Sequence, residues 1–464
     1  MLRRCAVLGI AALALCPRAR AADPDWRALD DETVSVLTRY VRLDTTNPPG
    51  NERACIAHIE GLLADAGIES TIRSRDAERP NLIARLPGRG AAPPLLLQGH
   101  VDVVTTAGQD WSRPPFAADV HDGYIWGRGA IDMKGGVTMM LAAVLRARAE
   151  GLEPAGDVIF CALADEENMS PYGADWLVRE HSELFDGVRH AIGEFGGFTM
   201  HAGGRRFYPI QVLEKQVCTV RMTISGAPGH GSLPVRGGAM ARLARVLRRL
   251  DRSRLPVHVT PVPRLMVEAM AAGLGGVQGA LLRLLLNPRL TDRVLDRMGD
   301  RARVLDPILH NTVSATGLRG SDKFNVIPGQ VEVMLDGRLL PGLAPQDLLD
   351  ELHGLLGAEI ELEVVKHDPG PPEADLALFG MLGSVLEDAD PGSIAIPLLM
   401  PGVSDGRFFA RLGIQTYGFT PMRLPADFNF WSGVHGADER IPVDAVEFGT
   451  SAITEALRRY GAAA

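Results

Sequence analysis

Cysteine is scarce in this chain, and disulfide patterns, basic blocks and internal repeats are missing. Only five of the 464 residues are cysteine, and two of them lie near the N-terminus. The other three are widely spaced, so the sequence contains neither a disulfide framework nor a cysteine-based zinc motif. We expect Cys55, Cys161 and Cys218 to be small buried apolar side chains.

The chain also lacks the positive charge that a nucleic acid or an anionic membrane would attract. Its formal net charge is −9, and no basic block stands out. No apolar run in the mature chain is long enough to cross a bilayer. Hydrophobic residues make up 46% and charged residues 23%, which is typical of a soluble globular protein. The length indicates two or three domains.

The N-terminus has the parts of a secretion signal. Two arginines precede a short apolar run over residues 5–15, and residues 19–21 fit a small-x-small cleavage site. We therefore expect residues 1–21 to be a signal peptide, and the mature chain to be exported to the periplasm or secreted. An uncleaved anchor is the alternative.

Helical and strand patterns alternate through the first half of the chain. Apolar residues at helical spacing predict a helix over residues 52–66, and a second helix is predicted over residues 136–149. Short apolar runs predict buried strands at residues 82–86, 95–97, 158–163 and 188–192. This alternation is typical of an α/β layer with a mostly parallel sheet flanked by helices.

The pattern changes after residue 213. Between residues 214 and 367 the order strand, helix, strand, helix, strand predicts a small α+β domain. The C-terminal part then returns to the α/β pattern, so the small domain is inserted into the larger one. We expect residues 22–213 and 368–464 to form the two parts of that larger domain.

Acidic and imidazole side chains follow several predicted strands. His100 and Asp102 follow one strand, and Glu166 and Glu167 follow another. Further candidates in the same kind of position are Asp132, Glu194 and His435. Because ligands collect at the carboxyl ends of parallel strands, we expect these side chains to converge. Converging carboxylates repel one another without a cation, and mixed carboxylate and imidazole ligands suit zinc. Each residue taken alone could instead be structural.

The same positions resemble a known family. The matching segments are residues 44–50, 99–102, 127–136, 165–167, 229–232, 325–328, 336–338 and 435–436. Their order and spacing resemble the co-catalytic di-zinc metallopeptidases, which include aminoacylase, glutamate carboxypeptidase, acetylornithine deacetylase and carboxypeptidase S. Residues 323–328 and 404–409 are most similar to the carboxypeptidase S branch. The resemblance implies a zinc-exopeptidase-like fold whose inserted domain is a lid and a dimer contact.

The resemblance also implies a role for each matched position. The implied metal ligands are His100, Asp132, Glu167, Glu194 and His435, with Asp132 bridging two zinc ions. Asp102 would hold the His100 ring, and Glu166 would be the general base. His230 would stabilise the oxyanion in the partner subunit's site. Asn325 and Arg338 would grip the substrate.

These roles predict a hydrolase that cleaves an amide bond next to a free carboxylate by means of metal-activated water. The expected substrate is a small peptide cut at its C-terminal bond, or an N-acyl amino acid. Two Zn²⁺ ions are the expected cofactors, with Co²⁺ or Mn²⁺ as alternatives, and the chain is expected to form a homodimer. Two other functions stay open: a small-metabolite deacylase or desuccinylase of the same fold, and a catalytically inactive zinc-binding protein.

Overall fold

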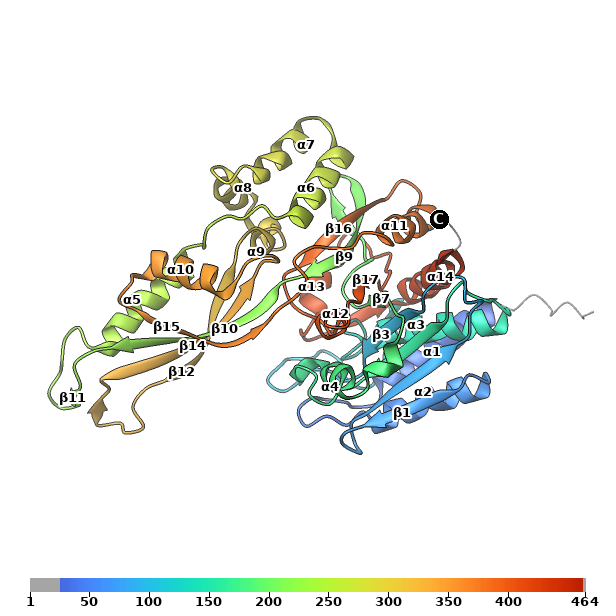
Figure 1. Cartoon of the computed structure of the whole chain (residues 1–464), viewed down its shortest axis with the longest axis horizontal. Coiled ribbons are helices and arrows are strands. Elements are labelled where there is room, and N and C mark those ends of the chain that lie inside the picture. The colour runs from blue at the N-terminus through green and yellow to red at the C-terminus, as the bar shows by residue number, and fades with distance from the viewer. Residues whose placement is uncertain (1–25, 462–464) are drawn as a thin grey trace, which may run out of the picture.

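The computed structural model describes residues 26–461, arranged as a broad α/β body with an elongated arm on one side (Figure 1). We call residues 216–254 and 310–368 the arm. The predicted signal peptide, residues 1–21, lies outside the described residues, so its cleavage and the exported location stay predictions. Within residues 26–461, none of the helices has both the length and the apolar character that a bilayer span requires.

A nine-stranded sheet forms the centre of the body. Its strands, in spatial order, are β1 (Ser70–Ser74), β2 (Pro80–Leu86), β6 (Val158–Leu163), β3 (Leu95–His100), β7 (His190–Gly193), β17 (Gln415–Gly418), β9 (Arg205–Glu214) and β16 (Ile394–Met400), with β8 (Met200–Ala202) paired to β9. The inner strands β6, β3, β7 and β17 run parallel to one another. The predicted fold class, a mostly parallel sheet flanked by helices, is confirmed.

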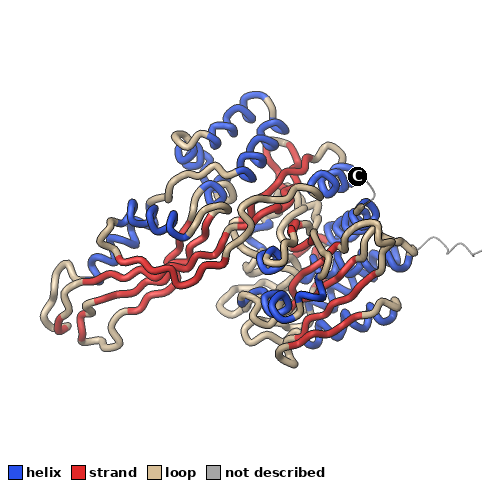
Figure 2. The backbone as a smooth tube through the Cα atoms, viewed as in Figure 1, coloured by secondary structure: helices blue, strands red, loops and turns tan. Residues whose placement is uncertain are grey.

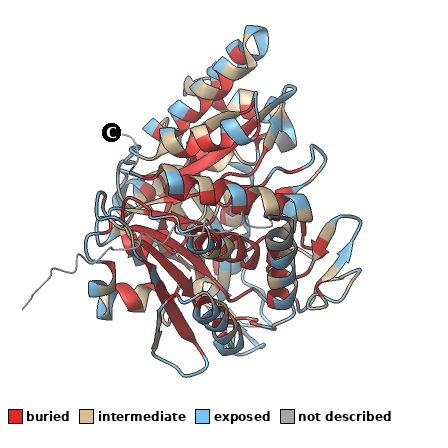
Figure 3. Ribbon diagram, turned by 90° about the vertical axis from the view of Figure 1, so that its right-hand side faces the viewer, coloured by how far each residue is buried: buried red, intermediate tan, exposed pale blue. Residues whose placement is uncertain are grey.

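Helices cover both faces of this sheet, which explains why its inner strands are mostly buried. Leu95 and Leu97 of β3 join one hydrophobic cluster, and Leu96 between them joins the cluster on the other face. The first cluster includes α1 (Trp26–Val41), α2 (Arg53–Asp65), α3 (Lys134–Ala149), α11 (Phe379–Ala389) and α14 (Val443–Arg459), and the second includes α4 (Ala174–Glu180), η2 (Ser182–Phe185) and α12 (Gly406–Ala410). Figure 3 shows the buried residues concentrated on the strands between these layers.

The arm is a four-stranded antiparallel sheet with its own core. Its elements are β12 (Thr312–Arg319), β14 (Gln330–Leu339), β10 (Gln216–Ser225) and β15 (Glu361–Asp368) in spatial order, with helices α5 (Ala239–Arg252) and α10 (Pro345–Leu356) packed on it. At the far tip, β11 (Gly229–His230) pairs with β13 (Val326–Ile327) (Figures 1 and 2).

Residues 261–309, which we call the helical segment, pack on the body rather than on the arm. The segment consists of α6 (Pro261–Leu274), α7 (Gly276–Leu282), η3 (Arg283–Leu286), α8 (Thr291–Met298), η4 (Gly299–Ala302) and α9 (Asp306–Leu309). Helix α6 lies against β16 and β9, and its Met266 and Met270 belong to the cluster of the large sheet. The stretch between residues 214 and 367 therefore contributes to both parts of the molecule.

Five short elements complete the rim of the body. Strands β4 (Asp119–His121), β5 (Tyr124–Trp126) and β18 (Arg440–Pro442) form a three-stranded antiparallel sheet. The turn η1 (Glu166–Asn168) follows β6, and α13 (Phe430–Gly433) precedes β18. These elements surround the carboxyl ends of the inner parallel strands.

Gly418, the last residue of β17, provides a test of how tightly the large sheet is packed at the carboxyl ends of its inner parallel strands. A Cβ atom there would lie 2.4 Å from the carbonyl oxygens of both Glu194 and Phe195. We expect Gly418→Ala to lower the free energy of unfolding by about 1–3 kcal/mol, as overpacking usually does. Urea denaturation measures this change. The control is Gly354→Ala on α10, where no atom lies within 4 Å of an added Cβ. Equal losses in the two variants would contradict the steric explanation.

Candidate metal centre and active site

The carboxyl ends of three neighbouring parallel strands bring the candidate residues together. Strand β3 ends at His100, β6 leads into η1 with Glu166 and Glu167, and β7 is followed by Glu194. In the pairing of β3 with β6, His100 lies opposite Leu163, the last residue of β6. Strand β7 pairs with the other side of β3. All three segments therefore open at one edge of the sheet, where open α/β sheets collect ligands.

The five predicted metal ligands form one compact cluster. His100 Nε2 lies 3.1 Å from Asp132 Oδ1 and 3.5 Å from Glu194 Oε2. His435 Nε2 lies 3.2 Å from Asp132 Oδ2 and 3.2 Å from Glu167 Oε2. The two oxygens of Asp132 thus face different imidazoles. The cluster consists of two halves that share this one carboxylate.

Burial and crowding shift the pKa values of these side chains. Burial, with a further contribution from Asp132, raises the pKa of Glu167 to about 7. Burial alone would lower the pKa of His100, but the neighbouring carboxylates of Asp102, Asp132 and Glu194 outweigh it and raise that pKa. Hydrogen bonds to Asp132 and Glu167 raise the pKa of His435 to about 10. Without a cation the cluster would therefore retain protons near neutral pH.

The donor set fits divalent cations. Ligand atoms of His100, Asp132 and Glu167 lie within 4.8 Å of one another, and so do those of His100, Glu166 and Glu194. Glu167 Oε1 is buried and accepts no hydrogen bond from any residue of the described chain. A buried carboxylate oxygen without a donor is costly, and a bound cation would satisfy it.

Asp102 supports both the first imidazole and the turn that holds the acids. Its carboxylate Oδ1 lies 3.4 Å from His100 Nδ1, and its backbone oxygen lies nearer, at 3.0 Å. The carboxylate also accepts hydrogen bonds from the backbone N–H groups of Glu166, at 3.1 Å, and Glu167, at 3.2 Å. Asn47 donates its Nδ2 to Asp102 Oδ2 at 2.7 Å. Asn47 lies in the segment 44–50 that carries the family resemblance, but the sequence alone predicts no role for it.

Glu439 is a second supporting acid, which sequence analysis did not identify. Its buried carboxylate accepts backbone N–H groups from Gly129, Ile131 and Asp132 at 2.7 to 3.0 Å. Arg128 Nη1 lies 2.6 Å from the same carboxylate. Burial raises the pKa of Glu439, while Arg128 and the backbone donors oppose the rise. Glu439 thereby fixes the loop that presents Asp132. Its nearness to His435 in the sequence was the only available signal.

Glu166 lies on the Glu194 side of the cluster. Asp165, just before it, has a left-handed backbone with φ of +70°, which turns the chain sharply after β6. Burial, and then the Glu194 carboxylate, raises the pKa of Glu166 well above its usual value. Buried Arg407 is close, with its Nη1 3.9 Å from Glu166 Oε1. Burial therefore disfavours the charged form of Glu166, which lies beside the other acids of the cluster.

The three remaining predicted residues lie on the arm. His230 and Asn325 meet at the tip formed by β11 and β13, where the Gly231 N–H donates to the Asn325 carbonyl at 2.8 Å. Figure 1 shows this tip as the part of the arm farthest from the body. Arg338 lies near the other end of β14, opposite Val217 of β10. Within one chain, the structure does not bring the tip residues to the metal cluster.

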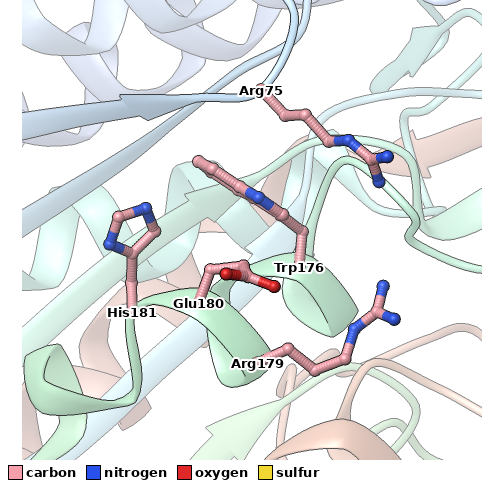
Figure 4. Close-up of a pocket in the computed structure, with 5 residues that line it drawn as sticks. All are labelled: Arg75, Trp176, Arg179, Glu180 and His181. Carbon is pink, nitrogen blue, oxygen red and sulfur yellow. The ribbon is translucent and has the colours of Figure 1, made fainter.

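A separate surface pocket of about 470 Å³ lies beside α4 (Figure 4). It is lined by Arg75, Trp176, Arg179, Glu180 and His181. Trp176 packs edge-on against His181, Arg75 donates to the Pro171 carbonyl, and Arg179 pairs with Asp175. None of the candidate site residues lines this pocket, so we assign it no part in the chemistry.

Comparisons with known proteins agree with this geometry. The pattern of Peptidase family M20/M25/M40 matches residues 96–459. "Probable carboxypeptidase S-like 2" of Dictyostelium discoideum is 27% identical over 369 residues, which cover 75% of this chain and 68% of that protein. The human "N-fatty-acyl-amino acid synthase/hydrolase PM20D1" is 29% identical over 385 residues, covering 79% and 74%. "Succinyl-diaminopimelate desuccinylase" of Maricaulis maris is 30% identical over 398 residues, covering 82% and 85%.

A solved structure shows the same fold. The M20 family metallo-carboxypeptidase Sso-CP2 from Sulfolobus solfataricus covers 93% of this chain and 100% of its own, with a TM-score of 0.64 at 17% identity. The resemblance inferred from sequence, including its carboxypeptidase S branch, is confirmed. The chain therefore belongs to Peptidase family M20/M25/M40 and is a hydrolase.

Proposed function

We propose that the chain is a di-zinc hydrolase that cleaves an amide bond next to a free carboxylate, in an N-acyl amino acid or at the C-terminus of a small peptide. The observation that carries the proposal is the position of Asp132, whose two oxygens face two imidazoles at 3.1 and 3.2 Å. One carboxylate so placed can be shared by two cations. A histidine nitrogen in each half favours zinc over a hard cation, with Co²⁺ and Mn²⁺ as alternatives.

Two bound zinc ions would acidify a water molecule and polarise the substrate carbonyl. Glu166 is the proposed base that takes the proton from that water. Its raised pKa suits this task, because a carboxyl group with a high pKa keeps the proton until it can pass it to the leaving amine. Arg407 lies close enough to stabilise the charged form before the reaction.

Asp102 and Glu439 are the proposed positioning residues. Asp102 holds His100 from one side and the backbone of η1 from the other, so it aligns a ligand and the base together. Glu439 holds the backbone of the Asp132 loop. Neither carboxylate is available for ligation, because donors from the chain already occupy both.

Arg338 is the proposed clamp for the substrate carboxylate. Its Nε and Nη2 donate to Asp336 at 2.9 and 3.0 Å, which fixes the plane of the guanidinium. Its Nη1 is buried and donates to no acceptor in the described residues. A substrate carboxylate would satisfy this donor with a charge-assisted hydrogen bond. The carboxypeptidase S-like and N-fatty-acyl-amino acid relatives are named for substrates that carry such a group.

We also propose a homodimer in which the arm of one subunit completes the site of the other. His230 and Asn325 lie at the arm tip, too far along the arm to serve the cluster of their own chain. Exposed apolar side chains surround them: Leu233 is 70% exposed and Phe324 is fully exposed. Apolar exposure of this kind marks a contact surface. In the dimer, His230 would donate to the developing oxyanion and Asn325 would contact the substrate.

A desuccinylase is the second candidate, favoured by the 30% identity to the Maricaulis maris protein. A desuccinylase activity would cleave the same type of bond, an amide, with the same proposed site residues. The difference lies in the acyl group of the substrate. A succinyl group would carry a second carboxylate, so the enzyme would need a second positively charged side chain, in addition to Arg338, to bind it. A hydrolysis screen of N-acyl amino acids, succinylated amino acids and dipeptides separates these substrates.

Removal of the proposed base should abolish most turnover without removing metal. We expect Glu166→Ala to keep the wild-type metal content and to lower kcat about 10²- to 10⁴-fold, the usual contribution of a positioned base. Metal content is measured by mass spectrometry and kcat with an N-acyl amino acid. Glu183→Ala, which removes an exposed acid from η2, is the control. A wild-type kcat in Glu166→Ala would exclude Glu166 as the base.

Metal removal should destabilise the protein more at high pH than at low pH. The pKa values of Glu167, about 7, and His435, about 10, are both raised in the metal-free fold. The stability that their bound protons contribute is therefore present at low pH and is lost as pH rises through these values. Metal competes with those protons, so the gain in Tm on adding zinc to chelator-treated protein should be larger at pH 8 than at pH 5.5.

Asp132→Asn serves as the control for this measurement, because it removes the shared carboxylate. In that variant the gain in Tm on adding zinc should be small at both pH values. A wild-type gain that is greatest at pH 5.5 would contradict the proposed ligand set.

The dimer proposal predicts complementation between two inactive variants. Glu166→Ala and His230→Ala should each be almost inactive alone. After subunit exchange the mixture should recover about a quarter of wild-type activity, because about half of randomly formed dimers are hybrids and each hybrid has one complete site. In the control experiment, two preparations of Glu166→Ala are mixed, and no activity should be recovered because every dimer lacks the base in both sites. Failure to recover activity, with hybrid dimers shown to be present, would rule out a role for the partner's His230.

A further inference from the structure

Helix α7 and the turn η3 present an apolar stripe to solvent that the proposed reaction does not use. Residues 269–282 contain no ionisable side chain. Val277, Leu281 and Leu284 follow one another at a spacing of four and three residues, which places them on one helical face. Their exposed fractions are 77%, 56% and 38%. We call these three residues the α7 stripe.

The opposite face of α7 is already packed. Gly279 is buried and so close to α6 that an added Cβ would lie 2.2 Å from the Ala271 carbonyl oxygen. Leu285 of η3 is fully buried in the cluster of the large sheet. The α7 stripe is therefore the outward face of a fixed helix. Figure 1 shows α7 at an outer end of the molecule, where a flat surface could reach it.

Exposed arginines without an ion-pair partner among the described residues lie in the same helical segment as the stripe. Five exposed arginines of the helical segment form no ion pair with any acid in the described residues: Arg264, Arg283, Arg289, Arg293 and Arg297. Residues 261–309 contain seven arginines and five acids. Of the acids, Asp292 pairs with His310, and both Asp296 and Asp306 pair with Arg254 of the arm. The segment is thus locally basic in a chain whose net charge is −9. The charge of the whole chain predicts no anionic membrane as a partner, but this local excess of arginines would attract an anionic surface.

We propose that the α7 stripe and these arginines dock the protein on the surface of an anionic lipid bilayer. Leucine and valine side chains on a short helix insert at the boundary between headgroups and acyl chains. Arginines beside them pair with lipid phosphates while their stems contact apolar groups. A second copy of this chain fits the surface less well, since a twofold contact would bring like-charged arginines together. The docking surface is separate from the metal cluster and does not depend on the proposed reaction.

Flotation with lipid vesicles tests this inference on the full chain. The vesicles consist of phosphatidylcholine, either alone or with phosphatidylglycerol. We expect binding to the anionic vesicles, and at least tenfold weaker binding for the variant Val277→Ser/Leu281→Ser/Leu284→Ser. The variant Arg289→Gln/Arg293→Gln should bind anionic vesicles about fivefold more weakly per arginine at low salt. On pure phosphatidylcholine the arginine variant should match the wild type.

The matched control is Val120→Ser, which removes another exposed apolar side chain, 56% exposed on β4, and should bind as the wild type does. All proteins carry the same N-terminus, so any contribution from residues 5–15 cancels. Circular dichroism and turnover of a soluble substrate should be unchanged in the stripe variant. No wild-type binding to anionic vesicles, or equal binding by the stripe variant, would overturn the inference. Loss of an oligomer in the stripe variant, without vesicle binding by the wild type, would instead identify a contact between copies.

Discussion

Crowding of negative charge around Asp132 is the constraint that shapes the rest of the site. Three buried carboxylates and two imidazoles lie within hydrogen-bond distance of one another, so the fold must be stable while those charges repel. Within the described residues, the hydrogen bonds to these carboxylates come from the two imidazoles and not from backbone N–H groups. Backbone N–H groups instead donate to two other acids, Asp102 and Glu439, and Glu167 Oε1 has no hydrogen-bond partner in residues 26–461. Under the proposed function, support and ligation would thus be divided between different carboxylates, which would keep the lone pairs of the ligands free for cations.

The parallel sheet makes this crowding achievable because its core is buried on both faces. Strand β6 is apolar along its whole length and β3 begins with three leucines, and two separate clusters hold these strands in register. The stability of those clusters can then offset sharp backbone turns at the sheet edge. Asp165 and His435 both have left-handed φ angles, +70° and +59°. Among the described residues the same backbone conformation recurs at Phe195, directly after Glu194, and at five other non-glycine residues, so three of these positions lie at or beside the cluster.

Local periodicity explains why much of this arrangement was predictable from sequence, and long-range pairing explains why the rest was not. The helices α2 and α3 and the strands β2, β3 and β6 follow from apolar spacing, and the acids after the strands follow from where parallel strands end. The hydrogen bond from the Asp132 backbone N–H to the Glu439 carboxylate joins residues 307 positions apart. No local sequence pattern predicts this contact. Apolar spacing also does not show that residues 261–309 pack on the body, where α6 contacts β16, rather than on the arm. An amphipathic helix specifies an apolar face but not the element that packs against it.

The arm separates the proposed substrate contacts along its length, and this separation links assembly to catalysis. Arg338 lies at the end of β14 near the body, while His230 and Asn325 lie at the opposite tip. A rigid antiparallel sheet joins the two ends, so the tip cannot fold back onto its own cluster without breaking that sheet. Under the proposed mechanism, a single subunit would hold the metals, the base and the clamp but would lack the donor for the oxyanion. Since stabilisation of the oxyanion is usually the largest electrostatic contribution to amide hydrolysis, an isolated subunit would bind substrate without turning it over efficiently. Dimer formation would then be part of the active site itself rather than an addition to it.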